Sequence, residues 1–298
     1  MAKIVESVPN ISEGRNKDTV EACVDQIRTT AGCKLLNYSS DVSHNRSVIT
    51  YIGSPESVEE ASVKLAKKAA ELIDMTKQQG EHPRMGAVDV MPFIPIREMT
   101  MEECVELSKR VGARIAKEAD FPVFLYESSA SAPHRKKLED IRRGQFEGMA
   151  EKVKSSDWIP DFGGQRIHPT AGVVAVGARK FLIAYNINLE TSDIEIANKI
   201  AKTIRESSGG YECVKAIGIM LKERNIAQVS INMTDYTKTP LYVVTDRVKS
   251  EAIKYGTKVI GTELIGLAPM DALIECAGHY LMIEDFDKSV QVVEGHLL

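Results

Sequence analysis

Apolar residues recur along the chain with two alternating periods, the two-residue period of strands and the 3.6-residue period of helices. In the N-terminal half they predict, in order, a strand at 3–8, a helix at 17–30, strands at 33–38 and 46–53, a helix opening at Pro55, a strand at 87–96, a helix at 100–117 and a strand at 122–126. The first six elements have the β-α-β-β-α-β order of a ferredoxin-like unit. Pro92 and Pro95 favour a strand end or a sheet edge, because proline cannot donate to a central ladder.

Residues 128–170 interrupt this series with Ser-rich and Gly-rich stretches, a run of charges and the single tryptophan, Trp158. We expect a long functional connection there, with helices near 135–142 and 145–154 at most. The second half then repeats the order, with a strand at 172–189 that is bent or broken near Gly177, a helix to 206 capped by Ser192, strands at 214–222 and 226–236, a helix at 240–255, a strand at 258–266 and a last helix from Pro269 to 283.

The order of elements predicts an α+β fold with two similar subdomains. Each is expected to be a ferredoxin-like sheet with helices on one face. The N-terminal subdomain covers residues 1–170, including the connection 128–170, and the C-terminal one covers residues 171–298. Two such sheets would face each other across a cleft, and clefts between domains are common ligand sites.

Composition narrows the class of protein. The chain has 298 residues, with 38 Lys+Arg against 42 Asp+Glu, and this net charge of −4 argues against a nucleic-acid partner. No run of 18 apolar residues predicts a membrane span, and the N-terminus turns polar too early for a secretory signal. The five cysteines are odd in number and contain no C-x-x-C pair, which favours a reducing, cytoplasmic location over a disulfide framework or a zinc ribbon.

Several familiar catalytic motifs are missing from the sequence. The segment from Gly172 to Arg179 has the glycine spacing of a P-loop, but Ala178 and Arg179 stand where the phosphates and Mg²⁺ require Lys and Ser or Thr. There is no nucleophile elbow G-x-S-x-G and no H-E-x-x-H. We therefore expect no nucleotide, no metal and no serine nucleophile; the acidic group around Asp285 is typical of a solvated helix end.

The stretch Glu81-His82-Pro83-Arg84-Met85-Gly86-Ala87 carries the strongest chemical signal. It precedes a predicted strand, and loops at strand mouths often present functional side chains. An imidazole exchanges protons near neutral pH, and Pro83 favours an extended backbone at His82. The alternative is a surface histidine in a turn, and the residue types alone do not exclude it.

Five separated strings, in the same order, resemble the formiminotransferase family over essentially the whole chain. They are VPNISEGR from Val8, NRSV from Asn45, EHPRMGA from Glu81, WIPDFG from Trp158 and GARKFLIAYNINL from Gly177. The resemblance implies transfer of a formimino group from N-formimino-L-glutamate to N5 of tetrahydrofolate, a step of histidine degradation and one-carbon metabolism. It also implies two subdomains around a folate-binding groove, and a homodimer. Because the chain ends at Leu298, we expect a monofunctional enzyme without the cyclodeaminase domain that eukaryotic relatives carry.

The resemblance also assigns site residues. The family's catalytic histidine maps onto His82, as a general acid and base, and tetrahydrofolate is the co-substrate. The family's folate-contacting stretch maps onto Gly163, Gly164, Gln165, Arg166, Ile167, His168, Pro169, Thr170, Ala171 and Gly172. Relatives often carry aspartates before the Asn-Arg motif, and Asp41 is the nearest candidate here.

Both substrates carry carboxylates, so basic side chains are attractive partners for them. The candidates for substrate binding, together with Asp41, are Arg46, Arg84, Arg179 and Lys180. Arg142 and Arg143 lie in a charged run that suits either a polyglutamate tail or, more simply, a solvated helix face. Glu81 or Asp89 is expected to hold the imidazole or the pterin, and His44 and His168 rank below His82 as substrate-lining residues.

Two other functions fit the same residues. One is formyl transfer between 5-formyltetrahydrofolate and glutamate, since the donors differ by NH against O at one position. The other is a non-catalytic folate-binding or regulatory protein, because folds of this kind serve many functions. The intact EHPR string speaks against the second.

Overall fold

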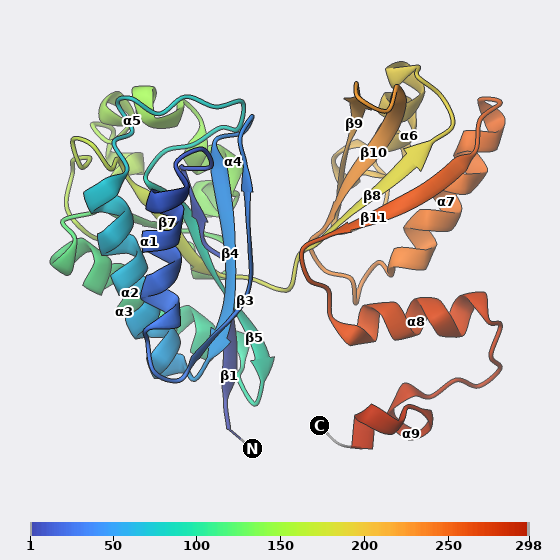
Figure 1. Ribbon diagram of the computed structural model, residues 1–298, viewed down its shortest axis with the longest axis horizontal. Coiled ribbons are helices and arrows are strands. Elements are labelled where there is room, and N and C mark those ends of the chain that lie inside the picture. Colours follow the sequence, from blue (N-terminus) through green and yellow to red (C-terminus); the bar gives the residue numbers. More distant parts are fainter. Residues whose placement is uncertain (1, 297–298) are drawn as a thin grey trace. The chain divides into compact units, whose positions relative to one another are not determined.

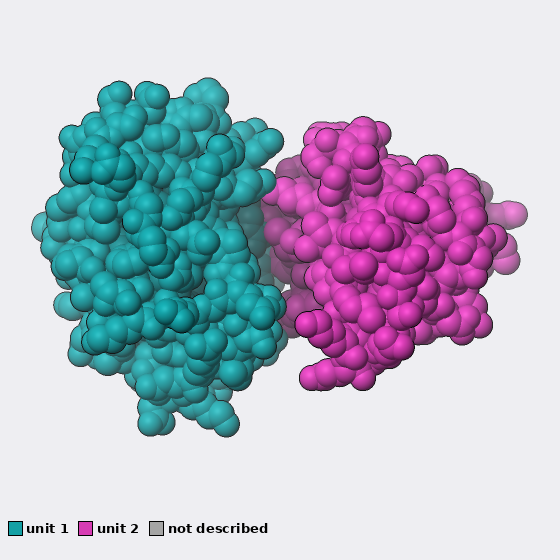
Figure 2. All heavy atoms as spheres, turned by 90° about the horizontal axis from the view of Figure 1, so that it is seen from above, with its two compact units in different colours: residues 1–179 teal, residues 180–298 magenta. Residues whose placement is uncertain are grey.

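The computed structural model describes residues 2–296 and divides the chain into two compact units. Unit 1 is Met1–Arg179 and unit 2 is Lys180–Leu298 (Figure 2). Each unit has one β-sheet, helices and a buried apolar core of its own, which confirms the α+β class. Among the described residues, no helix combines the length and the apolar character needed to cross a membrane.

Unit 1 follows the predicted order closely. Its strands and helices up to the connection are β1 (Ile4–Ser7), β2 (Asn10–Ile11), α1 (Lys17–Arg28), β3 (Cys33–Asp41), β4 (Arg46–Gly53), α2 (Pro55–Leu72), β5 (Val88–Arg97), α3 (Met101–Glu118) and β6 (Val123–Leu125). Strand β4 pairs with β3 on one side and with β1 and β2 on the other, and β5 pairs with β1 and β2 in turn. Strand β2, only two residues long, escapes sequence prediction.

Helices α1, α2 and α3 lie together on one face of this sheet (Figure 1). Each begins at a side-chain cap: Asn16 for α1, Ser54 for α2 and Thr100, in a complete capping box, for α3. Their apolar stripes, including Val24, Leu65 and Val111, are fully buried against the sheet. The opposite face of the sheet needs a separate cover.

The connection after β6 packs on that opposite face. It contains α4 (Leu138–Arg142), α5 (Gln145–Lys152) and three short 3₁₀ turns, and leads into β7 (Val174–Ala178). A second core joins it to the sheet; its buried members are Met85, Val90, Phe124, Tyr126, Ile141, Met149, Val153, Val173 and Ala175. Burial of Ile141 fixes α4, and so places the next residue, Arg142, over the sheet.

Two expectations about strands are wrong in detail. The strand expected at 172–189 is two strands in different sheets, because β7 runs parallel to β5 and β6 in unit 1 while β8 (Ile183–Leu189) belongs to unit 2. Strand β5 is central rather than marginal despite its prolines. Pro92 is tolerated because it falls between Val90, where pairing with β2 ends, and Phe93, where pairing with β1 begins.

Unit 2 repeats the strand order of unit 1 with fewer additions. After β8 it contains α6 (Ile194–Ile204), β9 (Val214–Leu221), β10 (Ile226–Met233), α7 (Leu241–Lys254), β11 (Val259–Ile265), α8 (Met270–Tyr280) and the short α9 (Lys288–Gln291). The sheet order is β11-β8-β10-β9. Asp193, not Ser192, caps α6, because the Asp193 carboxylate accepts from the Glu195 N–H. Helix α9 escapes sequence prediction.

Candidate active site

The loop that carries His82 is held on both sides by the sheet. The Met85 N–H donates to the Asp89 carboxylate at 3.0 Å, and the Met85 carbonyl accepts from Val173. The Ala87 N–H donates to the Ala171 carbonyl at 2.8 Å. The backbone after His82 is therefore fixed between β5 and the segment that leads into β7.

Two groups contact the imidazole of His82. Nδ1 lies 2.6 Å from the Pro83 carbonyl oxygen, which only accepts, so this contact favours the tautomer with the proton on Nδ1. Nη1 of Arg46 lies 2.8 Å from Nε2 and 2.5 Å from Nδ1. In that tautomer only Nε2 can accept from the guanidinium, so the shorter contact between Nη1 and Nδ1 is not a hydrogen bond.

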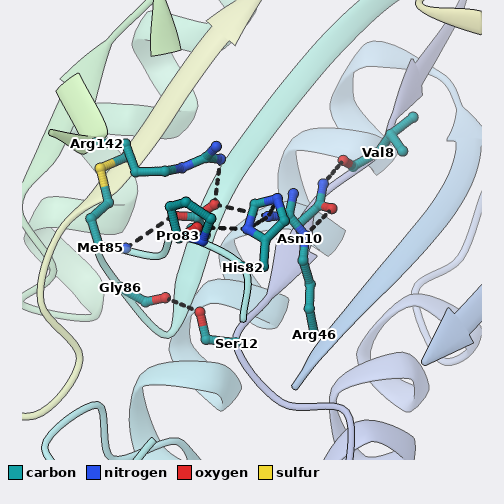
Figure 3. Close-up of polar contacts among 10 residues, drawn as sticks. Val8, Asn10, Ser12, Arg46, His82, Pro83, Met85, Gly86 and Arg142 are labelled. Atoms are coloured by element: carbon teal, nitrogen blue, oxygen red, sulfur yellow. Dashed lines mark hydrogen bonds and ion pairs between the residues drawn. The ribbon is translucent and has the colours of Figure 1, made fainter. Parts of the chain in front are cut away.

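A buried carboxylate, Asp89, links Arg46 to a second arginine, Arg142; Figure 3 shows both arginines together with His82. Asp89 is only 1% exposed, and its Oδ2 accepts from Nη2 of Arg142 at 2.5 Å and from Nη1 of Arg46 at 3.4 Å. The two guanidinium groups thus come from distant segments, β4 and α4, and share one negative charge. Asp89 holds the imidazole indirectly, through Arg46, rather than by a hydrogen bond of its own.

Arg46 is positioned by the hairpin between β3 and β4. Its Nε donates to the Asn10 side chain at 2.8 Å, and it lies opposite Asp41 in the strand register. Gly14 lets the first loop pass against this hairpin, because a Cβ on Gly14 would lie 2.3 Å from the Asp41 carbonyl oxygen and 2.6 Å from the Arg46 nitrogen. The SEGR string therefore matters for its backbone as much as for its side chains.

Burial and charge together lower the proton affinity of the site. Burial, followed by repulsion from Arg46 and Arg142, lowers the pKa of His82 from 6.5 to about 4. Burial lowers the pKa of Arg46 to about 10, and the neighbouring Arg142 adds to the shift. At neutral pH the imidazole is uncharged and Arg46 is still a cation.

A small hollow opens beside His82. It is lined by Ser12, His44, Asn45, Arg46, Gln78, Gln79, Gly80, His82 and Arg84. His44 lies edge-on to His82, with 6.1 Å between ring centroids, and its Nδ1 is 2.9 Å from the Asp41 carboxylate. The structure therefore brings Asp41, His44, Arg46 and His82 together.

Arg84 lies in the same loop but is already paired. Its terminal nitrogens donate to the two carboxylate oxygens of Glu147 in α5, at 2.9 and 2.6 Å, and to the Gln78 carbonyl. A substrate carboxylate would have to displace Glu147 to use this fork. Arg84 therefore ties α5 to the His82 loop in the structure as it stands.

The stretch from Gly163 to Gly172 meets the His82 loop only at its end. Gly172 bridges Gly86, and at its φ of +77° a Cβ would lie 2.3 Å from the Met85 carbonyl oxygen. The start of the stretch lies elsewhere, where Gly163 packs on Pro122 and Arg166 pairs with Asp120. His168 faces back into its own turn, with Nδ1 accepting from the Ala171 N–H.

The last two basic candidates have contacts other than His82. The Arg179 N–H donates to the Phe93 carbonyl, four residues beyond Asp89 on β5, and the Arg179 charge acts on Glu6 and Tyr126. Lys180 belongs to unit 2, where it pairs with Asp235.

Sequence reasoning undervalued Arg142. Its charged run indicates a solvated helix face, whereas the structure leaves only 14% of its side chain exposed and pairs it with Asp89. The available signal was Ile141, an apolar residue inside the charged run, which is completely buried. The neighbouring Arg143 is 80% exposed, as the pattern suggested.

The chain matches a known class of protein. A match to the N-terminal subdomain of the formiminotransferase domain covers residues 4–179, and a match to the formiminotransferase domain covers residues 184–295. The chain belongs to the formiminotransferase family, as the five strings indicated.

Individual relatives are similar over the whole chain. A glutamate formimidoyltransferase of Streptococcus pyogenes is 56% identical over 298 residues, which cover all of both chains. One of Thermoplasma acidophilum is 44% identical over 99% of this chain and 96% of its own. The formimidoyltransferase-cyclodeaminase of Mus musculus is 45% identical over 99% of this chain but only 55% of its own length, so the chain spans about half of that relative.

Proposed function

We propose that the chain transfers the formimino group from N-formimino-L-glutamate to N5 of tetrahydrofolate, giving 5-formiminotetrahydrofolate and L-glutamate. Its membership of the formiminotransferase family and the full-length similarity to glutamate formimidoyltransferases support this reaction. The observation that carries the chemistry is the uncharged, partly buried imidazole of His82 with Nδ1 fixed by Pro83.

His82 is proposed as the general acid and base. Attack of N5 on the amidine carbon gives a tetrahedral carbon, after which N5 must lose a proton and the glutamate nitrogen must gain one. Nε2 is the ring atom with a free electron pair, so it takes the N5 proton and then returns it to the leaving nitrogen. A low pKa makes the protonated ring a strong acid for that second transfer.

The contact between Arg46 and Nε2 has a consequence for this cycle. Nε2 cannot take a proton while Arg46 donates to it. Arg46 is also the nearest cation to the reacting atoms, so a substrate carboxylate that draws the guanidinium away would free the base. Ala171 and Gly172, which adjoin the His82 loop, are the part of the proposed folate-binding stretch nearest to this chemistry.

The test is product analysis with both substrates. Wild-type protein is incubated with N-formimino-L-glutamate and tetrahydrofolate, with and without a chelator, and 5-formiminotetrahydrofolate is quantified. We expect His82→Ala to lower turnover by about 10²- to 10⁴-fold, the usual contribution of a general acid and base. His279→Ala removes an exposed imidazole in unit 2 and serves as the matched control.

Parallel assays separate the other functions. Faster transfer from N-formyl-L-glutamate than from the formimino donor would favour formyl transfer. Tight binding of tetrahydrofolate without transfer from either donor would favour a binding protein. Absence of a chelator effect would agree with the proposal that the reaction needs no metal.

The expected topology of each unit, the folate-binding groove, the assembly and the location stay predictions. The strands of each unit lie in the same spatial order, with the first strand between the third and the fourth, and we propose on this basis that both units are ferredoxin-like. The folate-binding groove, the homodimer and the cytoplasmic location rest on the family resemblance and composition alone.

A further inference from the structure

The cluster beside His82 has one positive charge too many. Arg46 and Arg142 contribute two cations and Asp89 one anion, while His82 is neutral. Arg84 is paired with Glu147, and the Asp41 carboxylate contacts the His44 ring. Within residues 2–296, Asp89 is the one carboxylate that forms an ion pair with either guanidinium group.

Arg142 is also short of hydrogen bonds. Among the described residues it donates only through Nη2, to Asp89, and its Nε is buried without a partner. Buried donors are nearly always satisfied in folded proteins. Arg84 has a similar buried Nε, but both of its terminal nitrogens are held by Glu147. Arg142 thus retains donors for an acceptor that the protein itself does not supply.

We propose that Arg142 and Arg46 form a carboxylate-binding subsite for the α-carboxylate of the formimino donor, with Asp89 as the positioning residue that holds both guanidinium groups beside His82. This proposal rests on the proposed function, because it names the substrate group that the same site takes. It assigns Arg142 a contact with the formimino donor, whereas its sequence context suggested a polyglutamate tail or a solvated helix face.

The chemistry of the donor selects the α-carboxylate. The nitrogen that leaves is bonded to the carbon that bears this group, so it lies about 2.5 Å from the carboxylate carbon and about 3 Å from the nearer carboxylate oxygen. A leaving nitrogen at Nε2 of His82 therefore brings the α-carboxylate to the guanidinium groups around Asp89. The γ-carboxylate lies two methylenes further away, and the tail carboxylates of folate are separated from N5 by an aminobenzoyl group.

The subsite would also couple binding to catalysis. A second carboxylate gives each guanidinium a partner, and Arg46 can then turn from Nε2 of His82 to the substrate. The imidazole becomes free to act as a base only when the donor is bound. The added negative charge also favours the protonated imidazole, which the transfer to the leaving nitrogen requires.

A pair of neighbouring variants tests the subsite. Arg142→Gln removes the proposed contact, and Arg143→Gln makes the same change one residue later at a side chain that is 80% exposed and paired with Asp140. We expect Arg142→Gln to lower kcat/KM for the donor by about tenfold to hundredfold, the cost of a charged hydrogen bond, with KM for tetrahydrofolate unchanged. Arg143→Gln should stay within about twofold of wild type.

Donor amides distinguish contact from a structural effect. In the wild type, the α-amide of the donor should lose about tenfold to hundredfold in kcat/KM. In Arg142→Gln that penalty should nearly vanish, while the penalty for the γ-amide persists. The proposal would be overturned if Arg142→Gln kept the full α-amide penalty. It would also be overturned if Arg142→Gln changed only how KM for tetrahydrofolate depends on the length of the folate tail. Arg142→Lys keeps the charge and should recover part of the loss. If Arg142→Gln does not fold, the kcat/KM values of Arg142→Lys with the α-amide and γ-amide donors decide instead.

Calorimetric titration separates this inference from the proposed reaction. L-glutamate and its α-amide are titrated into wild type, Arg142→Gln and Arg143→Gln without tetrahydrofolate, so no turnover is needed. A preference for L-glutamate that is lost only in Arg142→Gln supports the subsite even if formimino transfer is not observed. Equal preference in all three proteins, or no binding of L-glutamate to the wild type, would overturn it.

Discussion

The two units have the same strand order, but the fourth strand of that order carries a different carboxylate network in each unit. In unit 1 the fourth strand of the repeat, β5, carries Asp89, which is 1% exposed and shared by two arginines. In unit 2 the corresponding strand, β11, carries Glu263, which is 36% exposed and accepts from Arg224, Asn188 and Gln228. One cluster is buried with an excess cation, and the other is balanced and open to solvent.

The connection 128–170 accounts for the difference. Only unit 1 has this insertion, and its helix α4 brings Arg142 onto the sheet through the burial of Ile141. In both units the fourth strand of the repeat supplies a carboxylate, on an internal strand in unit 1 and on the edge strand in unit 2. The insertion converts the one in unit 1 into a charged site. The comparison suggests that chemistry belongs to unit 1 and that the network in unit 2 stabilises its sheet.

The largest predicted effect on stability separates the two carboxylates. Asp89→Asn leaves two largely buried guanidinium groups without an anion and should cost about 3 to 5 kcal/mol of unfolding free energy. Glu263→Gln should cost less than about 1 kcal/mol, because its pair with Arg224 is exposed. Urea unfolding checks this, with fluorescence of the single Trp158 reporting unit 1 and circular dichroism reporting both units. Equal costs would remove the contrast between the units.

A matched pair of glycines gives the next largest effect. Gly172 and Gly266 have φ values of +77° and +76°, so alanine at either costs about 1 to 2 kcal/mol of backbone strain. Only at Gly172 would the new Cβ meet the Met85 carbonyl, at 2.3 Å, while nothing lies within 4 Å at Gly266. We expect Gly172→Ala to cost about 3 kcal/mol or more and to impair turnover, and Gly266→Ala to leave turnover intact. Equal thermal unfolding shifts would contradict the close packing of the His82 loop.

The pKa of His82 provides a test of the local charge. The ring should titrate near pH 4 in the folded protein, against 6.5 in the unfolded chain. Between these values the unfolded state binds more protons, so the free energy of unfolding falls as the pH drops from about 6.5 toward 4. NMR titration of the imidazole protons, with His82→Gln to identify the signal, measures the pKa directly. A midpoint near 6.5 would mean that neither burial nor the two guanidinium groups act on the ring.

The smallest predicted effect lies away from both carboxylate networks. Thr100→Ala removes the capping box of α3 in unit 1 and should cost about 1 kcal/mol, with no effect on turnover. Asp193→Ala removes the cap of α6 in unit 2 and should cost a similar amount. Thermal unfolding of the two variants checks both. A large loss of turnover in Thr100→Ala would show that the site depends on helix packing more broadly than the contacts around Asp89 indicate.

Periodic segments could be predicted from the sequence because local pattern decides them. The strand expected at 46–53 is β4, and the cap and proline at Ser54 and Pro55 open α2 as expected. The sheet to which β7 belongs could not be predicted, because Val174–Ala178 has the pattern of any buried strand and only its partners distinguish the units. The same limit applies to the site: His82 and Arg46 lie in recognisable strings, whereas Arg142 gains its place through tertiary packing of Ile141.

The central claim is that His82 transfers the protons of formimino transfer in unit 1. The most direct measurement is the rate at which 5-formiminotetrahydrofolate forms from N-formimino-L-glutamate and tetrahydrofolate, in wild type, His82→Ala and His279→Ala. The account predicts formation by wild type and His279→Ala, and a rate about 10²- to 10⁴-fold lower for His82→Ala with tetrahydrofolate binding retained. A His82→Ala rate close to that of wild type would contradict it.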